Sequence, residues 1–425
     1  DPLTGKGLPV ERRELEADPE RARDSEHGAA RARNSKSARL QSEDRKRRRE
    51  TMGVLDKIVV GGLELNNSVA MAPLTRGRAS ERGVPTKIMA TYYEQRAGAG
   101  LIISEGTTIS QQASGWFCAP GIYTDEQREA WKPVTQAVHA KGGKIALQLW
   151  HLGRQCSSQV TGLPIVSSSS EPLTQKVTAK HGAKVDPEIP HSLTVEEIGQ
   201  VVKDYANATK NALDAGFDMV EIHGANGYLV DQFTQSKTNK RTDEYGGSIE
   251  NRLRFMNEVM DAVIDAAGSA DKVGIRISPN GAFAEMGSED NVETFSQALR
   301  NIADRKLGYV HIMDGLGFGF HNLTKPFTLA MAREIVGKDM VIMGNVGYTL
   351  EEADKCIASG DADMIAIGRP FIGTPDLVER YREGIAPNPD APQSTWWDSS
   401  LGAKGYIDYP SRHELQASAT KTTSE

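Results

Sequence analysis

Eight short aliphatic runs recur between Ser68 and Gly368, and segments with a helical hydrophobic period separate them. This alternation is typical of repeated βα units around a parallel sheet. The predicted strands are 68–71, 101–105, 144–149, 219–223, 273–277, 309–313, 341–344 and 364–368. Capping boxes at Thr194 and Thr349 each precede a glutamate by three residues and mark helix starts. The pattern predicts an α/β fold with a single (β/α)₈ TIM barrel; an open doubly wound sheet is the alternative.

Charge and cysteine content narrow the class of protein further. The 425 residues include 50 Lys and Arg against 57 Asp and Glu, a mildly acidic balance that argues against a nucleic-acid partner. The three cysteines form no CxxC pair, which argues against a disulfide framework or a cysteine-ligated metal site. No stretch approaches the roughly 18 apolar residues that a membrane helix needs. We therefore expect a cytoplasmic protein without a membrane partner.

Residues 1–51 differ from the rest of the chain, with 14 Lys or Arg, 11 Asp or Glu and no aromatic residue. Such a segment cannot bury enough apolar surface to offset the entropy lost on ordering. We therefore expect a disordered charged tail over 1–51 and a folded domain over 52–425. The basic cluster 45–49 is interpreted as part of a solvated tail, with a localisation or polyanion-binding patch as the alternative. Met52 fits the natural start of the folded unit, and on that interpretation the tail is not native.

The ends of the predicted strands are unusually polar. In TIM barrels the active site lies at the carboxyl ends of the strands, so these residues are candidates for a site. A purely structural core would place aliphatic side chains there, so we expect a ligand with many hydrogen-bonding groups. The candidates on the first five strands and their following turns are Pro73, Leu74, Thr75, Gly106, Gln148, Trp150, His223, Asn226, Tyr228 and Arg276.

The last two strand ends carry Gly344, Asn345, Gly368 and Arg369. This is the usual phosphate position of the fold, because backbone N–H groups of small turns and a helix start point at an anion there. Arg276, deep in the fifth strand, needs an anionic or strongly accepting partner if it is buried. A structural pair with a buried carboxylate is the alternative for Arg276.

Three residues at the end of the fourth strand indicate electrophile activation. His223 and Asn226 are spaced to donate hydrogen bonds to a single oxygen atom. Tyr228 stays protonated at neutral pH and can protonate a developing carbanion. A satisfied core histidine is the alternative for His223. No second histidine stands at metal-ligand spacing and no GxSxG elbow occurs, so neither a metal site nor a Ser-His-Asp nucleophile is predicted.

Five motifs occur in order along 52–412 and together resemble one known family. They are MAPLTR at 71–76, QLW at 148–150, HGANGYL at 223–229, RTDEYGGSIENR at 241–252 and GYIDYP at 405–410. The chain resembles the old yellow enzymes, the FMN-dependent NADPH dehydrogenases and ene-reductases that include the 12-oxophytodienoate reductases. The resemblance implies tightly bound, non-covalent FMN, NADPH or NADH as hydride donor, an enone or enal as substrate, and a monomer or homodimer.

The resemblance also implies roles for the candidate residues. Thr75 and Gln148 would bind the pyrimidine edge of the flavin, with Arg276 facing N1, while Pro73, Leu74 and Gly106 complete that side. The last two strand ends, Gly344, Asn345, Gly368 and Arg369, would hold the phosphate. His223 and Asn226 would bind the substrate carbonyl, hydride would pass from flavin N5 to the β-carbon, and Tyr228 would protonate the α-carbon.

Two departures from the family pattern predict a narrow substrate pocket. Trp116 and the pair Trp396–Trp397 stand where smaller aromatic residues or tyrosine are common, so we expect Trp116, Trp150 and Trp397 to line the substrate. Two alternatives remain at this point. One is a flavin-free barrel lyase or isomerase acting on a phosphorylated small molecule, and the other is a non-enzymatic binder acting through the basic cluster of the tail.

Overall fold

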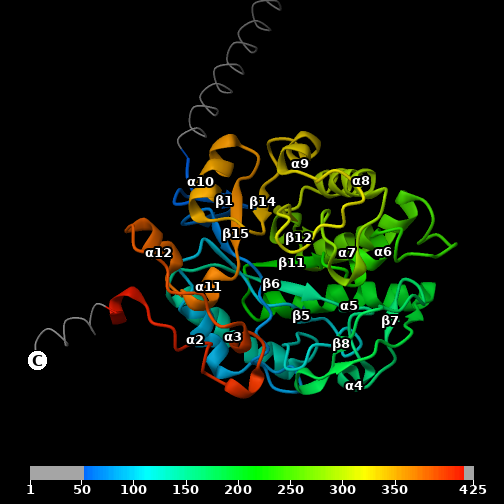
Figure 1. The fold of residues 1–425 in the computed structure, drawn as a ribbon, viewed down its shortest axis with the longest axis horizontal. Helices are drawn as coiled ribbons and strands as arrows, with labels where there is room; N and C mark the ends of the chain where they lie inside the picture. The colour runs from blue at the N-terminus through cyan, green and yellow to red at the C-terminus, as the bar shows by residue number, and fades with distance from the viewer. Residues whose placement is uncertain (1–51, 416–425) are drawn as a thin grey trace, which may run out of the picture. The chain divides into compact units, whose positions relative to one another are not determined.

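The computed structural model describes residues 52–415, so the tail predicted over 1–51 lies outside the described residues. The centre of the molecule is a parallel sheet whose strands follow one another in chain order (Figure 1). Pairing of β11 with β6 closes the ring, so the predicted TIM barrel is confirmed and the open sheet is excluded. The barrel strands are β3 (Val69–Met71), β4 (Leu101–Ile103), β6 (Ile145–Trp150), β11 (Met219–Gly224), β12 (Val273–Ile277), β13 (Tyr309–Met313), β14 (Ile342–Asn345) and β15 (Met364–Ile367).

Helices surround the strands (Figure 1). Both predicted capping boxes form: the Thr194 and Thr349 side chains accept from the backbone N–H groups of Glu197 and Glu352, each at 3.2 Å. Within 52–415, no helix has the length and apolar character needed to cross a bilayer. The helices are α2 (Lys87–Glu94), α3 (Asp125–Ala140), α4 (Ser158–Thr161), α5 (Val195–Asp214), α6 (Leu229–Thr234), α7 (Ile249–Ala267), α8 (Asn291–Asp304), α9 (Leu329–Val336), α10 (Leu350–Ser359), α11 (Pro370–Gly373) and α12 (Leu377–Arg382).

The connection between β6 and β11 is long and spans residues 151–218. Between α4 and α5 it forms two small pairs of strands, of which one is antiparallel and the other parallel. A further short strand, β5 (Thr107–Thr108), extends the barrel sheet beside β6. The paired strands of the connection are β8 (Val177–Thr178) with β9 (Lys184–Val185), and β7 (Val166–Ser167) with β10 (His191–Ser192).

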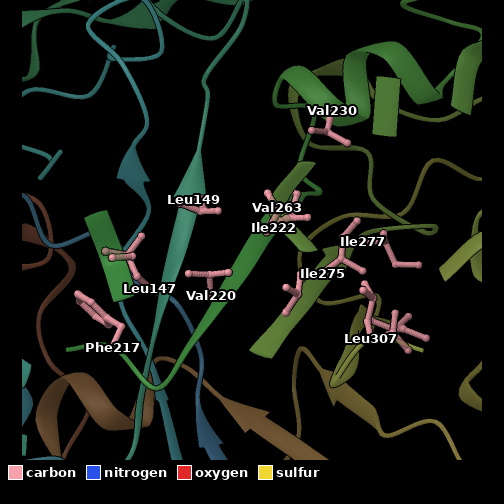
Figure 2. Close-up of a cluster of buried hydrophobic side chains, with 14 of the residues drawn as sticks. Leu147, Leu149, Phe217, Val220, Ile222, Val230, Val263, Ile275, Ile277 and Leu307 are labelled. Atoms are coloured by element: carbon pink, nitrogen blue, oxygen red, sulfur yellow. The ribbon is translucent and has the colours of Figure 1, made fainter. Parts of the chain in front are cut away.

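Each barrel strand presents an apolar face to the helices. Figure 2 shows this outer layer, in which side chains of β6, β11 and β12 lie among those of the surrounding helices. Successive side chains of a strand point to opposite faces, so the residues between these apolar ones point into the barrel. The labelled outward residues are Leu147, Leu149, Val220, Ile222, Ile275 and Ile277, with Val230 and Val263 from α6 and α7.

A hairpin that the sequence did not predict packs against the interior of the barrel. Its strands, β1 (Ile58–Val60) and β2 (Leu63–Leu65), are too short to show a period. Val60 and Leu65 are buried in one cluster with residues from the amino-terminal parts of the barrel strands, such as Leu101 and Met219. The hairpin therefore makes the amino end of the barrel interior apolar, and the inward polar residues lie toward the carboxyl ends.

Ile222→Ala tests the packing of the outer layer. Ile222 is fully buried, so we expect the free energy of unfolding to fall by about 2–5 kcal/mol as a cavity opens between strand and helix. Equilibrium urea unfolding measures the change. The control is Ile189→Ala, because Ile189 is 75% exposed and its truncation should change stability by less than about 0.5 kcal/mol. Equal losses in both variants would contradict the assigned packing.

Candidate active site

Polar side chains gather inside the barrel toward the carboxyl ends of neighbouring strands. The register of the sheet places Gln148 opposite Glu221, His223 opposite Arg276, and Arg276 opposite His311. All five of these residues are buried. Five adjacent polar side chains inside a barrel need compensating partners, so their contacts define what the site can bind.

Glu221 is the negative centre of this belt. Its carboxylate accepts hydrogen bonds from Gln148 Nε2 at 2.8 Å, from the Tyr309 hydroxyl at 3.1 Å, and from His311 Nδ1 at 2.8 Å. Burial by itself would raise the pKa of Glu221, but His311 and Arg276 outweigh it and hold that pKa below its usual value. Glu221 is therefore ionised at neutral pH.

Arg276 is the positive centre. Nη2 donates to Asn345 Oδ1 at 2.6 Å, and the Asn345 amide is itself held because Nδ2 donates to the Ala366 carbonyl at 2.7 Å. Burial lowers the pKa of Arg276 to about 10, so the guanidinium keeps its charge at neutral pH. Nε has no hydrogen-bond partner among the described residues. Arg276 forms no ion pair in that part of the chain, which leaves it able to face an anion.

His223 and Tyr228 lie against each other at the end of β11. Their ring centroids are 4.8 Å apart, and Tyr228 also meets the Trp150 ring edge-on at 5.0 Å. Burial, with Arg276 and His311 adding to it, holds the pKa of His223 well below its usual value, so the imidazole is neutral. Burial raises the pKa of Tyr228, so the phenol keeps its proton. His223 Nδ1 has no partner among the described residues.

Asn226 lies in the turn between His223 and Tyr228. Its φ of +57° is in the left-handed region, which asparagine tolerates better than most residues. Its N–H donates to Ser278 Oγ at 2.8 Å and its carbonyl accepts from Gln155 Nε2 at 2.7 Å. The backbone of the turn is therefore fixed on both sides, and the side chain amide takes no part in fixing it.

The three tryptophans predicted to line the substrate differ in depth: Trp150 is buried, whereas Trp116 and Trp397 lie nearer the surface. A Cβ on Gly106 would stand 2.6 Å from Cε3 of the Trp150 indole, so the close approach requires glycine there. Trp397 is 43% exposed at the rim, with its ring 6.1 Å from that of Trp116. Trp116 also packs against the buried cluster that contains Trp150, as Tyr228 does. Trp116 therefore lies between this cluster and the exposed Trp397.

Arg76 ties the segment that carries Trp396 and Trp397 to the end of β3. Nε donates to the Trp396 carbonyl at 3.0 Å and Nη2 to the Gly405 carbonyl at 2.8 Å. The Arg76 N–H in turn donates to the buried Glu105 carboxylate at 3.0 Å. The rim is therefore held by a fully buried arginine.

The remaining candidate residues differ in their exposure and contacts. Pro73, Leu74 and Thr75 follow β3 and are partly exposed, and Leu74 lies beside Gly368. Arg369 is exposed and its guanidinium carbon lies 5.5 Å from the Trp396 ring centroid. A Cβ on Gly344 would stand 2.8 Å from Leu329 Cδ1, so Leu329 packs closely against this glycine.

Asn345 is more deeply engaged than the sequence indicates. Besides its side chain contacts, its backbone N–H donates to Asp314 Oδ1 at 3.1 Å. Its polar groups thus serve the protein interior, and its direct contribution is to hold Arg276.

Sequence reasoning missed Glu221, Tyr309 and His311. A usable signal was present, because Glu221 and His223 alternate with Val220 and Ile222, and His311 stands between Val310 and Ile312. In a strand that is apolar on its outer face, such alternation places the polar residues inside the barrel.

Asn345→Ala tests how Arg276 is held. The variant leaves Nη2 of a buried cation without its acceptor, so we expect the free energy of unfolding to fall by about 1.5–3 kcal/mol. Urea unfolding measures it. The matched control is Gln200→Ala on the exposed face of α5, which should be close to neutral. A neutral Asn345→Ala would mean that the Arg276–Asn345 bond contributes nothing.

Comparison with known proteins agrees with this geometry. Residues 55–388 match the model of the family described as NADH:flavin oxidoreductase / NADH oxidase. The chain is 42% identical over 366 residues to chanoclavine-I aldehyde reductase of Penicillium roqueforti, covering 84% of this chain and 96% of the relative. It is 40% identical over 375 residues to 12-oxophytodienoate reductase 1 of Oryza sativa subsp. japonica, covering 85% and 94%.

A solved structure is equally similar. The old yellow enzyme homologue of Zymomonas mobilis superposes with a TM-score of 0.80 at 40% identity, covering 84% of this chain and 99% of that one. These matches confirm the resemblance and favour a flavin enzyme over the flavin-free lyase or isomerase. The chain therefore belongs to the NADH:flavin oxidoreductase / NADH oxidase family, and within it to the old yellow enzymes, the FMN-dependent ene-reductases that NADH or NADPH reduces.

Proposed function

We propose that this enzyme reduces the C=C bond of small enones and enals, with its substrate bound between His223, Asn226 and Tyr228. The observation that carries the proposal is the contact of a neutral imidazole with a protonated phenol, 4.8 Å between ring centroids. Both groups border the buried, charged Arg276. Hydrogen-bond donors with a cation beneath them suit a reaction in which negative charge develops.

The residues present fit FMN. Arg276 Nε and His223 Nδ1 are buried polar atoms without hydrogen-bond partners in the described part of the chain. Buried polar atoms are normally paired, so a ligand bound at the carboxyl end of the barrel is expected to supply the missing partners. We assign the ring to Pro73, Leu74, Thr75, Gly106, Gln148 and Arg276, and the phosphate to Gly344, Gly368 and Arg369. Asn345 contributes indirectly, by holding Arg276. When bound, FMN would supply the hydride chemistry that carries the two electrons of NADPH or NADH to the substrate β-carbon.

The side chains of the turn then act on the other end of the double bond. His223 and Asn226 donate hydrogen bonds to the substrate carbonyl oxygen, and these bonds strengthen as enolate charge develops there. Tyr228 donates the proton to the α-carbon. Because burial raises the pKa of Tyr228, the phenol is a weak acid that protonates only a strongly basic carbon.

The aromatic residues set which substrates enter. Trp150 forms the buried wall, while Trp116 and Trp397 narrow the rim, so small enones are favoured over large ones. We further propose a cytoplasmic enzyme, monomeric or homodimeric, whose partners are small molecules and include neither nucleic acid nor membrane.

Tyr228→Phe separates proton donation from the rest of the reaction. We expect the rate at which 2-cyclohexenone reoxidises the reduced enzyme to fall by about 10²- to 10⁴-fold, because general acid catalysis is lost. Reduction by NADPH should be unchanged, since Tyr228 gives no proton in that step. Anaerobic stopped-flow absorption measures both half-reactions.

Tyr245→Phe is the matched control, because Tyr245 donates to Glu258 on α7 and should affect neither rate. Equal slowing of both half-reactions in Tyr228→Phe, or no slowing of reoxidation, would contradict the assigned role of Tyr228.

A further inference from the structure

One buried ionised group takes no part in the proposed reaction. Glu221 precedes His223 by two residues on β11, so both side chains point into the barrel. Its carboxylate is fully buried and accepts from three side chains on two other strands, Gln148 of β6 and Tyr309 and His311 of β13. Removing a carboxylate from water is unfavourable, so a group retained here needs an explanation beyond packing.

The charge of Glu221 acts on the same region as that of Arg276. Glu221 raises the pKa of Arg276 through its field, against the larger effect of burial, although no hydrogen bond between the two is formed in the described structure. The positive charge of the Arg276 guanidinium is therefore only partly offset by the Glu221 carboxylate, which acts without direct contact. A ligand beside Arg276 experiences both charges, one attracting and one repelling added negative charge.

The contact with Gln148 shows which property of Glu221 matters. A carboxylate only accepts hydrogen bonds, so Gln148 must turn Nε2 toward it. A glutamine at position 221 keeps one oxygen, which can accept from Tyr309 and His311. Its amide nitrogen then faces Gln148 and donates to Oε1 of that side chain once the Gln148 amide turns over. Glu221→Gln therefore removes the charge and reverses one hydrogen bond.

We propose that Glu221 is a positioning residue that lowers the reduction potential of the bound FMN by opposing the positive field of Arg276. The proposal rests on the proposed function, because it places FMN beside Arg276. Reduced flavin carries its added negative charge at N1, so a buried anion beneath the site disfavours the reduced state. Lower potential makes the enzyme a stronger reductant of the enone.

The test compares midpoint potentials of FMN-loaded wild-type and Glu221→Gln enzyme at pH 8, by anaerobic spectral titration against a reference dye. We expect the variant to favour reduction about tenfold more, which is a rise of about 30 mV for a two-electron couple. Tyr309→Phe keeps the ring and removes one donor to the carboxylate, so its potential should move the opposite way. The control is Glu258→Gln, on α7, with no expected shift.

An unchanged or lowered potential in Glu221→Gln would overturn the proposal. If that variant does not fold, Tyr309→Phe decides alone, and an unchanged or raised potential overturns it. Failure of the proposed function is distinguishable, because wild-type enzyme would then hold FMN yet not be reoxidised by 2-cyclohexenone. A merely structural role for Glu221 would lower stability and leave the potential of the bound flavin unmoved.

Discussion

Arg276 carries a positive charge inside the barrel with 6% of the residue exposed, and the rest of the site is arranged around that charge. An uncompensated buried ion is destabilising by several kcal/mol, and side chains on β11 and β14 compensate this one. Asn345 accepts from the guanidinium, and Glu221 offsets it through the field. Glu221 in turn requires donors, which come from Gln148 and from two residues of β13.

The same charge explains the chemistry at the mouth. Burial and the nearby Arg276 keep His223 neutral, so it offers a hydrogen bond without bringing a second cation. Tyr228 lies beside His223 and keeps its phenol proton. Two other parts of the structure support these groups. Val60 and Leu65 of the hairpin fill the amino end of the barrel with apolar side chains. At the other end, Arg76 binds the segment that carries Trp396.

Much of this frame could be predicted from the sequence, and the reasons are physical. Buried parallel strands read as aliphatic runs, so 273–277 and 309–313 were predicted with the bounds that the structure has. The features that sequence analysis missed depend on contacts between residues that are far apart in the sequence. The β1–β2 hairpin is recognisable only from what it buries, and the Asn345 amide is spent on Arg276 and Ala366, which no local pattern reveals. The partners of Glu221 likewise lie far from it in sequence, on β6 and β13.

The central claim is that the polar carboxyl end of this barrel holds FMN and passes electrons from NADPH to an enone. The most direct measurement is the visible absorption spectrum of the purified protein without air, before and after adding NADPH and then 2-cyclohexenone. We expect a yellow flavin band that bleaches with NADPH and returns with the enone. A colourless protein that takes up no added FMN, or a band that NADPH leaves unchanged, would contradict the claim.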